Sequence, residues 1–183
     1  MNKKSLDRKT AQIFIIESRE KGKTDQEIYF DLTQKYYDTK AVALLITGTV
    51  SIANKNKYKV YNNILVGLLG LSIVFKLLTI LNLTVQTGQL WTLVLVFIVP
   101  LFAAYFMYEI ARYNAPIYRF CGWLTIAGFL QTVGKMEMGT DILLNIIFAS
   151  AVAGLSFYLD SKLFPEYSPK NLKKDSNGDY ILS

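Results

Sequence analysis

Histidine is absent from the 183-residue sequence, and cysteine occurs once, as Cys121. Without histidine the chain lacks the commonest metal ligand and the commonest general base near neutral pH. A single cysteine excludes an intramolecular disulfide, and the apolar residues around Cys121 predict a packed, inert thiol. Serine-hydrolase and phosphate-loop signatures are missing too. We therefore expect no metal site and no cofactor.

Charged residues are scarce between Asn62 and Phe164, although the chain carries a formal net charge of +6. Residues 1–61 hold twelve of the twenty Lys and Arg residues and seven of the fourteen Asp and Glu residues. A soluble domain would distribute its charges more evenly. Because the cations alternate with acids and form no single patch, no nucleic-acid partner is expected.

Four apolar segments are long enough to cross a bilayer. They lie at about 63–83, 90–111, 116–134 and 141–163, each close to the ~20 residues that cover a hydrocarbon core of ~30 Å. Helices that are apolar all round are seldom found in soluble proteins. The predicted fold class is all-α: an integral membrane four-helix bundle over residues 62–164, with a small N-terminal cytosolic helical unit.

The charges that flank the spans predict their direction. Positive residues occur before the first span, in the connection 112–115 and in the tail 165–183, whereas the connections 84–89 and 135–140 contain one lysine between them, Lys135. By the positive-inside rule both termini are cytoplasmic. The layout resembles that of many small bacterial membrane proteins, so we expect the bacterial cytoplasmic (inner) membrane.

Residues 1–50 predict a cytosolic three-helix unit. The first helix is expected at about 6–20. A capping box of Thr24 and Glu27 opens the second helix, and the third helix starts at Asp38 or Thr39 and ends at Gly48. A unit of this size cannot bury a large core alone. We expect it to dock on the membrane, on the inner loops or on a second copy.

Two polar segments adjoin the spans. In the basic juxtamembrane linker 51–61, Lys55, Lys57 and Lys59 are expected to contact lipid headgroups, with a specific lipid or nucleotide phosphate site as the alternative. The cytosolic tail 165–183 contains the turn signal Asn177-Gly178, which predicts either a short hairpin or a disordered end.

Lys76 is the most unusual residue of the first predicted span, because a charge inside a membrane costs a few kcal/mol. Its ammonium either extends to the outer headgroups or pairs with Asp141 or Glu137 at the same side. Polar residues of the third and fourth spans lie toward that side as well. The candidate intramembrane polar site consists of Lys76, Gln131, Thr132, Lys135, Asp141 and Asn145. The simpler interpretation of these polar stripes is that they are seams where helices pack. The functional interpretation is a narrow polar path or a small-molecule cavity at the outer half of the bundle.

Two further features concern the second span. Pro100 removes a backbone hydrogen bond near its middle and predicts a kink. Glu109 and Arg112, three residues apart at its inner end, predict an inner charged collar together with Asp160 of the fourth span.

Three functional hypotheses follow. The first is a non-enzymatic membrane component that self-associates or joins another membrane protein, with the N-terminal helices binding a cytosolic partner. The second is a small oligomeric transporter or pore for ions or small solutes. The third is a membrane-embedded enzyme, for which Asp141 with Lys76 or Lys135 is the one defensible acid–base pair.

Overall fold

The computed structural model describes residues 4–87, 92–133, 140–168, 172–176 and 178–182. Within these ranges the chain forms seven helices and no strand, so the all-helical prediction is confirmed. The residues divide into two compact units. We call Met1–Tyr58 with Asp160–Ser183 the terminal unit, and Lys59–Leu159 the bundle unit.

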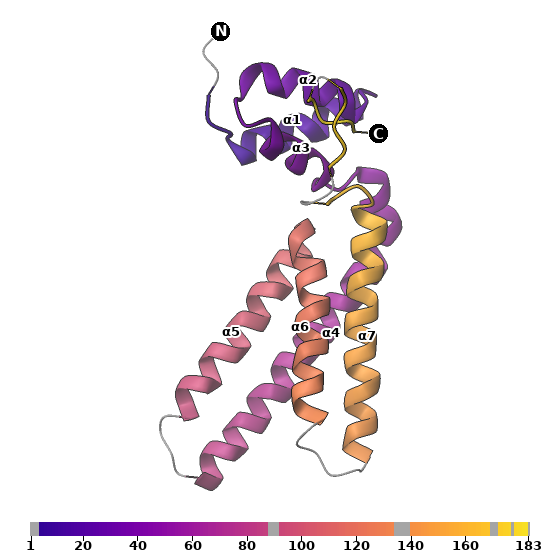
Figure 1. Ribbon diagram of the computed structural model, residues 1–183. Helices are drawn as coiled ribbons and strands as arrows, with labels where there is room; N and C mark the ends of the chain where they lie inside the picture. The colour runs from indigo at the N-terminus through magenta and orange to yellow at the C-terminus, as the bar shows by residue number, and fades with distance from the viewer. Residues whose placement is uncertain (1–3, 88–91, 134–139, 169–171, 177, 183) are drawn as a thin grey trace. The chain divides into compact units, whose positions relative to one another are not determined.

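Three short helices, α1 (Arg8–Glu20), α2 (Asp25–Lys35) and α3 (Thr39–Thr47), form most of the terminal unit (Figure 1). Each begins at a side chain that accepts hydrogen bonds from the first turn. Asp7 caps α1 and Asp38 caps α3. The predicted capping box is present at α2: the Thr24 hydroxyl accepts from the Glu27 amide, and Glu27 accepts from the Thr24 amide at 2.8 Å. Local sequence therefore determines where these helices start.

The core of the terminal unit combines all three helices with the end of the chain. Its buried members are Ala11, Ile15, Ile28, Tyr29, Leu32, Val42, Ala43, Ile46, Tyr180 and Leu182. The last two arrive on a tight hairpin in which Lys174 bridges to Tyr180 and the Asp175 amide donates to the Asp179 carbonyl at 2.8 Å. This pairing of the described residues agrees with the hairpin alternative for the tail, and Asn177 of the predicted turn lies outside the described residues. A three-helix unit too small to bury a core alone is thereby completed by the C-terminal residues.

Arg19 connects the helices of the terminal unit. Its guanidinium binds Asp25 at the start of α2 through two hydrogen bonds of 2.8 and 2.6 Å. It also donates to the carbonyl of Ile46 in the last turn of α3 and to that of Thr49, just beyond the helix. The planar guanidinium has enough donors to bind a carboxylate bidentately and two carbonyls at once, which a lysine ammonium cannot do in this geometry.

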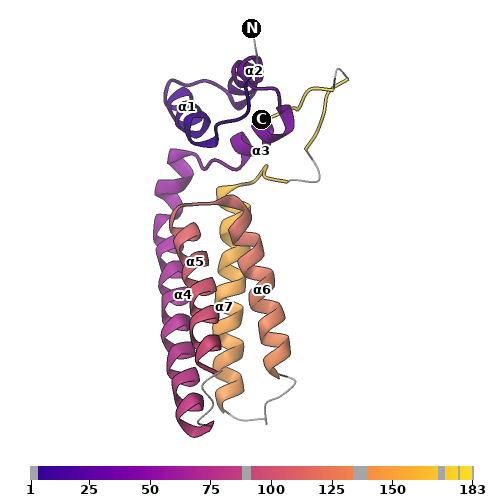
Figure 2. The ribbon, with the colours of Figure 1, turned by 90° about the vertical axis from the view of Figure 1, so that its left-hand side faces the viewer.

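Four long helices follow: α4 (Ile52–Thr87), α5 (Thr92–Ala111), α6 (Ala115–Val133) and α7 (Thr140–Leu163). Within the bundle unit consecutive helices run in opposite directions (Figures 1 and 2). The linker predicted at 51–61 is the first part of α4, so the three lysines lie on a helix that continues into the first predicted span. Pro100 lies inside α5, which continues on both sides of it. The kink at Pro100 stays a prediction.

Large apolar side chains are exposed on each of these four helices. They include Leu71, Val74, Phe75, Leu101, Phe102, Trp123, Leu130, Leu143, Leu144 and Ile147. Two helical segments of the described chain, Ile52–Leu78 and Leu143–Leu163, are long and apolar enough to cross a membrane. So much exposed apolar surface is uncommon on a soluble monomer and indicates a site of contact with lipid or protein.

Candidate functional site

A cavity of about 460 Å³ lies within the bundle unit, bordered by all four of its helices. Three members of the predicted intramembrane polar site line it: Lys76 from α4, Gln131 from α6 and Asn145 from α7. The structure therefore brings residues from three separate helices into one cavity. The sequence offered a small-molecule cavity at this depth only as the alternative to a packing seam, and it could not show which helices border it.

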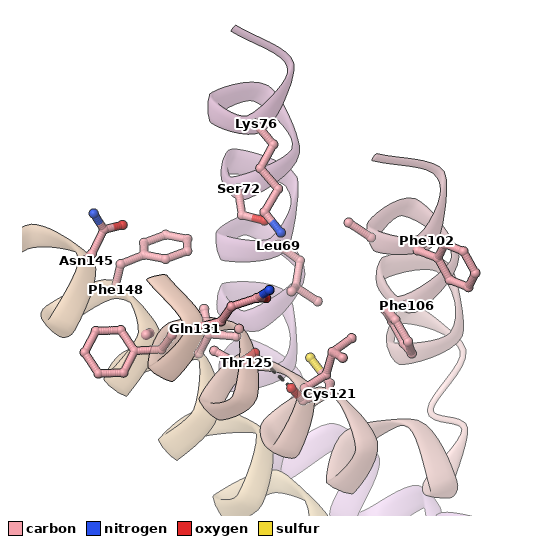
Figure 3. A pocket seen from close by; sticks show the side chains of 16 residues that line it. Leu69, Ser72, Lys76, Phe102, Phe106, Cys121, Thr125, Gln131, Asn145 and Phe148 are labelled. Carbon is pink, nitrogen blue, oxygen red and sulfur yellow. Dashed lines mark hydrogen bonds between the residues drawn. The ribbon is translucent and has the colours of Figure 1, made fainter. Parts of the chain in front are cut away.

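The Lys76 side chain runs along α4 toward Ser72 and Leu69, away from the Thr87 end of the helix (Figure 3). Its ammonium and the amide of Gln131 point into the same space, beside Leu69 (Figure 3). This is the direction opposite to the outward extension that we considered for Lys76. The ammonium therefore lies along the cavity that Lys76 lines, although the residue is exposed in the single chain.

Aromatic side chains form much of the remaining wall. Phe102 and Phe106 of α5, Phe129 of α6 and Phe148 of α7 line the cavity. Polar groups are fewer. The Thr125 hydroxyl donates to the Cys121 carbonyl of the preceding turn at 2.8 Å. Its proton is therefore used in a hydrogen bond within α6. Among the described residues that line it, the cavity thus combines the cation of Lys76 and a few neutral polar groups with an apolar wall.

The other predicted members of this site are only partly described. Thr132 lies in α6 and Asp141 in α7, and only the backbone of both is described. Lys135 and Glu137 lie outside the described residues. The pairing of Lys76 with Asp141 or Glu137 stays a prediction. In the described part of the chain, His, Cys, Asp and Glu form no group of three or more that could hold a metal ion.

Glu109 and Arg112, the two residues of the predicted collar at the end of α5, each bind another residue and not one another. Glu109 accepts a hydrogen bond of 2.6 Å from the Asn114 amide. Arg112 donates to the Tyr108 hydroxyl at 2.8 Å and stacks over that ring. Each charged side chain is therefore held by a neighbour along its own turn. Asp160 is buried near the end of α7 and belongs to the terminal unit, so its link to the other two stays a prediction.

A buried polar cluster near this turn was not predicted. Asn62 of α4 and Tyr118 of α6 are both almost completely buried. The Tyr118 hydroxyl donates to Asn62 Oδ1 at 2.5 Å and lies 3.0 Å from the Ile110 carbonyl, which also accepts from Asn62 Nδ2 at 3.3 Å. Buried polar groups of this kind tie helices together because each needs its partner.

Tyr113 joins the same cluster from an unusual backbone conformation. Its φ of 60° is in the left-handed region that glycine normally occupies at the end of a helix. The Tyr113 amide donates to the Ile110 carbonyl and the Asn114 amide to the Glu109 carbonyl, the two bonds of a Schellman motif. Burial raises the pKa of the Tyr113 hydroxyl, and its hydrogen bond with Asn62 opposes that shift. A tyrosine at this position supplies a contact that glycine would lack.

The three lysines predicted to bind headgroups are exposed on the first turns of α4. Lys55 and Lys59 lie one turn apart, and the Lys57 ammonium lies 5.5 Å from the centre of the Tyr58 ring. This arrangement leaves positive charge on more than one side of α4. It is compatible with a diffuse headgroup contact, and both the headgroup contact and the alternative phosphate site stay predictions.

No family model, no curated protein and no solved structure matches this chain, so the site is interpreted from its own chemistry.

Proposed function

We propose that the chain is an integral membrane protein with four spans, α4 to α7, which acts without catalysis by associating with a second copy of itself in the bilayer. In this proposal both termini, together with the terminal unit, lie in the cytoplasm, and the membrane is the bacterial inner membrane. The exposed apolar side chains of the four helices support the spans. At about 54 Å, the 36 residues of α4 exceed the ~30 Å core, so Lys55, Lys57 and Lys59 can reach headgroups.

The observation that carries the association is an exposed face of small residues on α7. Ser150, Ala151 and Gly154 are all exposed within the bundle unit. A Cβ atom added at Gly154 would meet no described atom within 4 Å. In a membrane, helices associate where small residues allow their backbones to approach closely. A small-residue face left uncovered in the single chain is therefore suited to a helix of a second copy.

Matched glycine substitutions test this proposal. Gly154→Leu would place a large side chain on the α7 face, whereas Gly67→Leu does the same on α4, where a Cβ also has open space. Native mass spectrometry of the protein extracted with its lipids should show a defined oligomer for the natural chain and for Gly67→Leu, and mainly monomer for Gly154→Leu. A monomeric natural chain, or equal behaviour of both variants, would contradict the association.

The four-span topology has a separate test. A reporter fused after Ser183 should be cytoplasmic, and a reporter inserted in the connection 84–89 should lie on the opposite side of the membrane. If both reporters are cytoplasmic, the proposed number of spans is wrong. This outcome would not depend on the oligomeric state.

The terminal unit is the proposed partner-binding part of the chain. Ile13 and Ile16 are neighbours on one face of α1, with 51% and 38% of their surfaces exposed. Together they form a small exposed apolar patch, which is the surface that we propose for the partner. A photo-reactive residue at position 16 should cross-link a cytosolic protein or a second copy in intact cells, and Ile13→Lys should abolish that product. Cross-linking unchanged by the substitution would exclude this face.

The cavity favours a second candidate function, a small transporter or pore. It contains a cation inside a bundle of helices that is otherwise largely apolar. Proteoliposomes with the natural chain would then release small anions faster than those with Lys76→Met. Equal, background-level release in both would argue against transport.

A further inference from the structure

The lining of the bundle cavity is electrically unbalanced. Lys76 contributes a positive charge, and the described residues that line the cavity include no carboxylate. The polar groups around it, which include Ser72, Thr125, Gln131 and Asn145, are neutral. Lys76, Gln131 and Asn145 are exposed in the single chain, so it is the proposed membrane placement that removes this cation from water. A cation in that environment is stabilised by an anion or by several hydrogen-bond acceptors. The cavity is therefore suited to an anion.

The depth of Lys76 in the proposed membrane strengthens the case for a bound anion. In the proposed first span, 63–83, Lys76 lies about 5 Å past the midpoint and about 10 Å from the outer end, at 1.5 Å per residue. Its side chain turns toward Ser72, which brings the ammonium still closer to the midpoint (Figure 3). Headgroups at the bilayer surface are therefore poor partners for it, and a partner has to enter the cavity.

The apolar walls of the cavity indicate the chemistry of the rest of the ligand. Leu69, Phe106, Phe129, Phe148 and Val152 surround the polar groups. A volume of about 460 Å³ is sufficient for one small organic molecule or part of a lipid. A bare inorganic anion would leave these apolar walls without a partner. An anion attached to an apolar body would satisfy both parts of the cavity.

We propose that this cavity binds an anionic amphiphile, with Lys76 forming an ion pair with its carboxylate or phosphate and Gln131 hydrogen-bonding the same group. The apolar body of the ligand packs between α5, α6 and α7. This inference rests on the proposed membrane placement but not on association through α7. A fatty acid and an acidic phospholipid share the required chemistry.

Native mass spectrometry of the full chain in detergent tests the proposal and separates the two sources. Oleic acid, phosphatidylglycerol and phosphatidylcholine are added in turn. We expect retention of at least one of the two anionic molecules, the better-retained one identifying the source, and at least tenfold weaker retention of zwitterionic phosphatidylcholine. Lys76→Met should lower retention of the anionic molecule at least tenfold. Lys76→Arg keeps the positive charge, so this variant should still retain the anionic molecule.

Two outcomes would overturn the proposal. One is equal retention of phosphatidylcholine and the anionic molecules, or retention unaffected by Lys76→Met. The other is an ion pair between Lys76 and Asp141 within the chain. In that case the natural chain shows no selectivity for anionic molecules, and Asp141→Asn creates this selectivity because it frees Lys76. Gly154→Leu should change the oligomer without changing retention, so that failure of the lipid site and failure of the association are distinguished.

Discussion

The hydroxyl of Tyr118 donates a hydrogen bond of 2.5 Å to Oδ1 of Asn62, joining α6 to α4 across 56 residues of sequence. Both side chains are at most 1% exposed. In the proposed membrane placement the hydrophobic effect does little to hold helices together, so interhelical hydrogen bonds and close packing decide which helices are neighbours. On that proposal we expect this bond to contribute to the pairing of α4 with α6.

Replacement of Tyr118 by phenylalanine should destabilise the bundle unit. The substitution removes the hydroxyl donor and leaves the buried Asn62 Oδ1 without it, at a cost of about 1–2 kcal/mol. Thermal unfolding in detergent measures the effect. The control is Tyr105→Phe, because the Tyr105 ring is 52% exposed. Equal unfolding temperatures for the two variants would show that the bond contributes no stability.

The packing of α6 against α7 depends on Gly122. A Cβ at this position would lie 2.7 Å from the tip of the Phe157 ring, whereas a Cβ at Gly128 meets no described atom within 4 Å. Gly122→Ala should therefore displace Phe157 from its edge-on contact with Trp123 and lower stability by about 1 kcal/mol. Gly128→Ala should be neutral or slightly stabilising, because alanine is favoured over glycine inside a helix. Comparable unfolding of both variants would contradict the close approach.

Local signals in the sequence predicted much of the terminal unit. The capping box at Thr24, the cap at Asp38 and the end of α3 at Gly48 are all determined by residues a few positions apart. The docking of the tail was not predictable in this way. The Gln26–Leu182 contact joins residues 156 positions apart, and it depends on tertiary packing alone.

The bundle unit shows the same limit. Helical spacing predicts which residues share a face, and it placed Lys76, Gln131 and Asn145 among the polar residues of their helices. It does not predict which helices become neighbours. Asn62 was missed because a single asparagine at the start of an apolar segment is also expected at the membrane boundary, and only its burial against Tyr118 reveals its role.

Acid should loosen the start of α2. The hydrogen bonds from Thr24 lower the pKa of the Glu27 carboxyl below its ordinary value of 4.5. The carboxylate therefore stabilises the capped helix at neutral pH, and this contribution is lost as the pH falls below about 4.5 through the lowered pKa. Amide NMR signals of residues 24–28 report the change locally. In Glu27→Gln, which does not titrate, those signals should stay constant over the same range.

A local readout is needed because a second cap titrates nearby. Hydrogen bonds from Thr10 and Lys9 also lower the pKa of Asp7 at the start of α1. A global unfolding curve would combine the two carboxylates. If the amide signals of residues 24–28 shifted equally in the natural chain and in Glu27→Gln, the capping box would not be their cause.

Gln26 should hold the C-terminal residues in the core of the terminal unit. Its side-chain amide accepts from the Leu182 amide at 2.7 Å and donates to the Tyr180 carbonyl at 3.2 Å, as a neighbouring strand would. Gln26→Ala removes both bonds, at about 1 kcal/mol, and should speed hydrogen exchange at Leu182 about fivefold. Gln34→Ala, at an exposed position of α2, is the control. Unchanged exchange in Gln26→Ala would mean that burial of Tyr180 and Leu182 alone retains the tail.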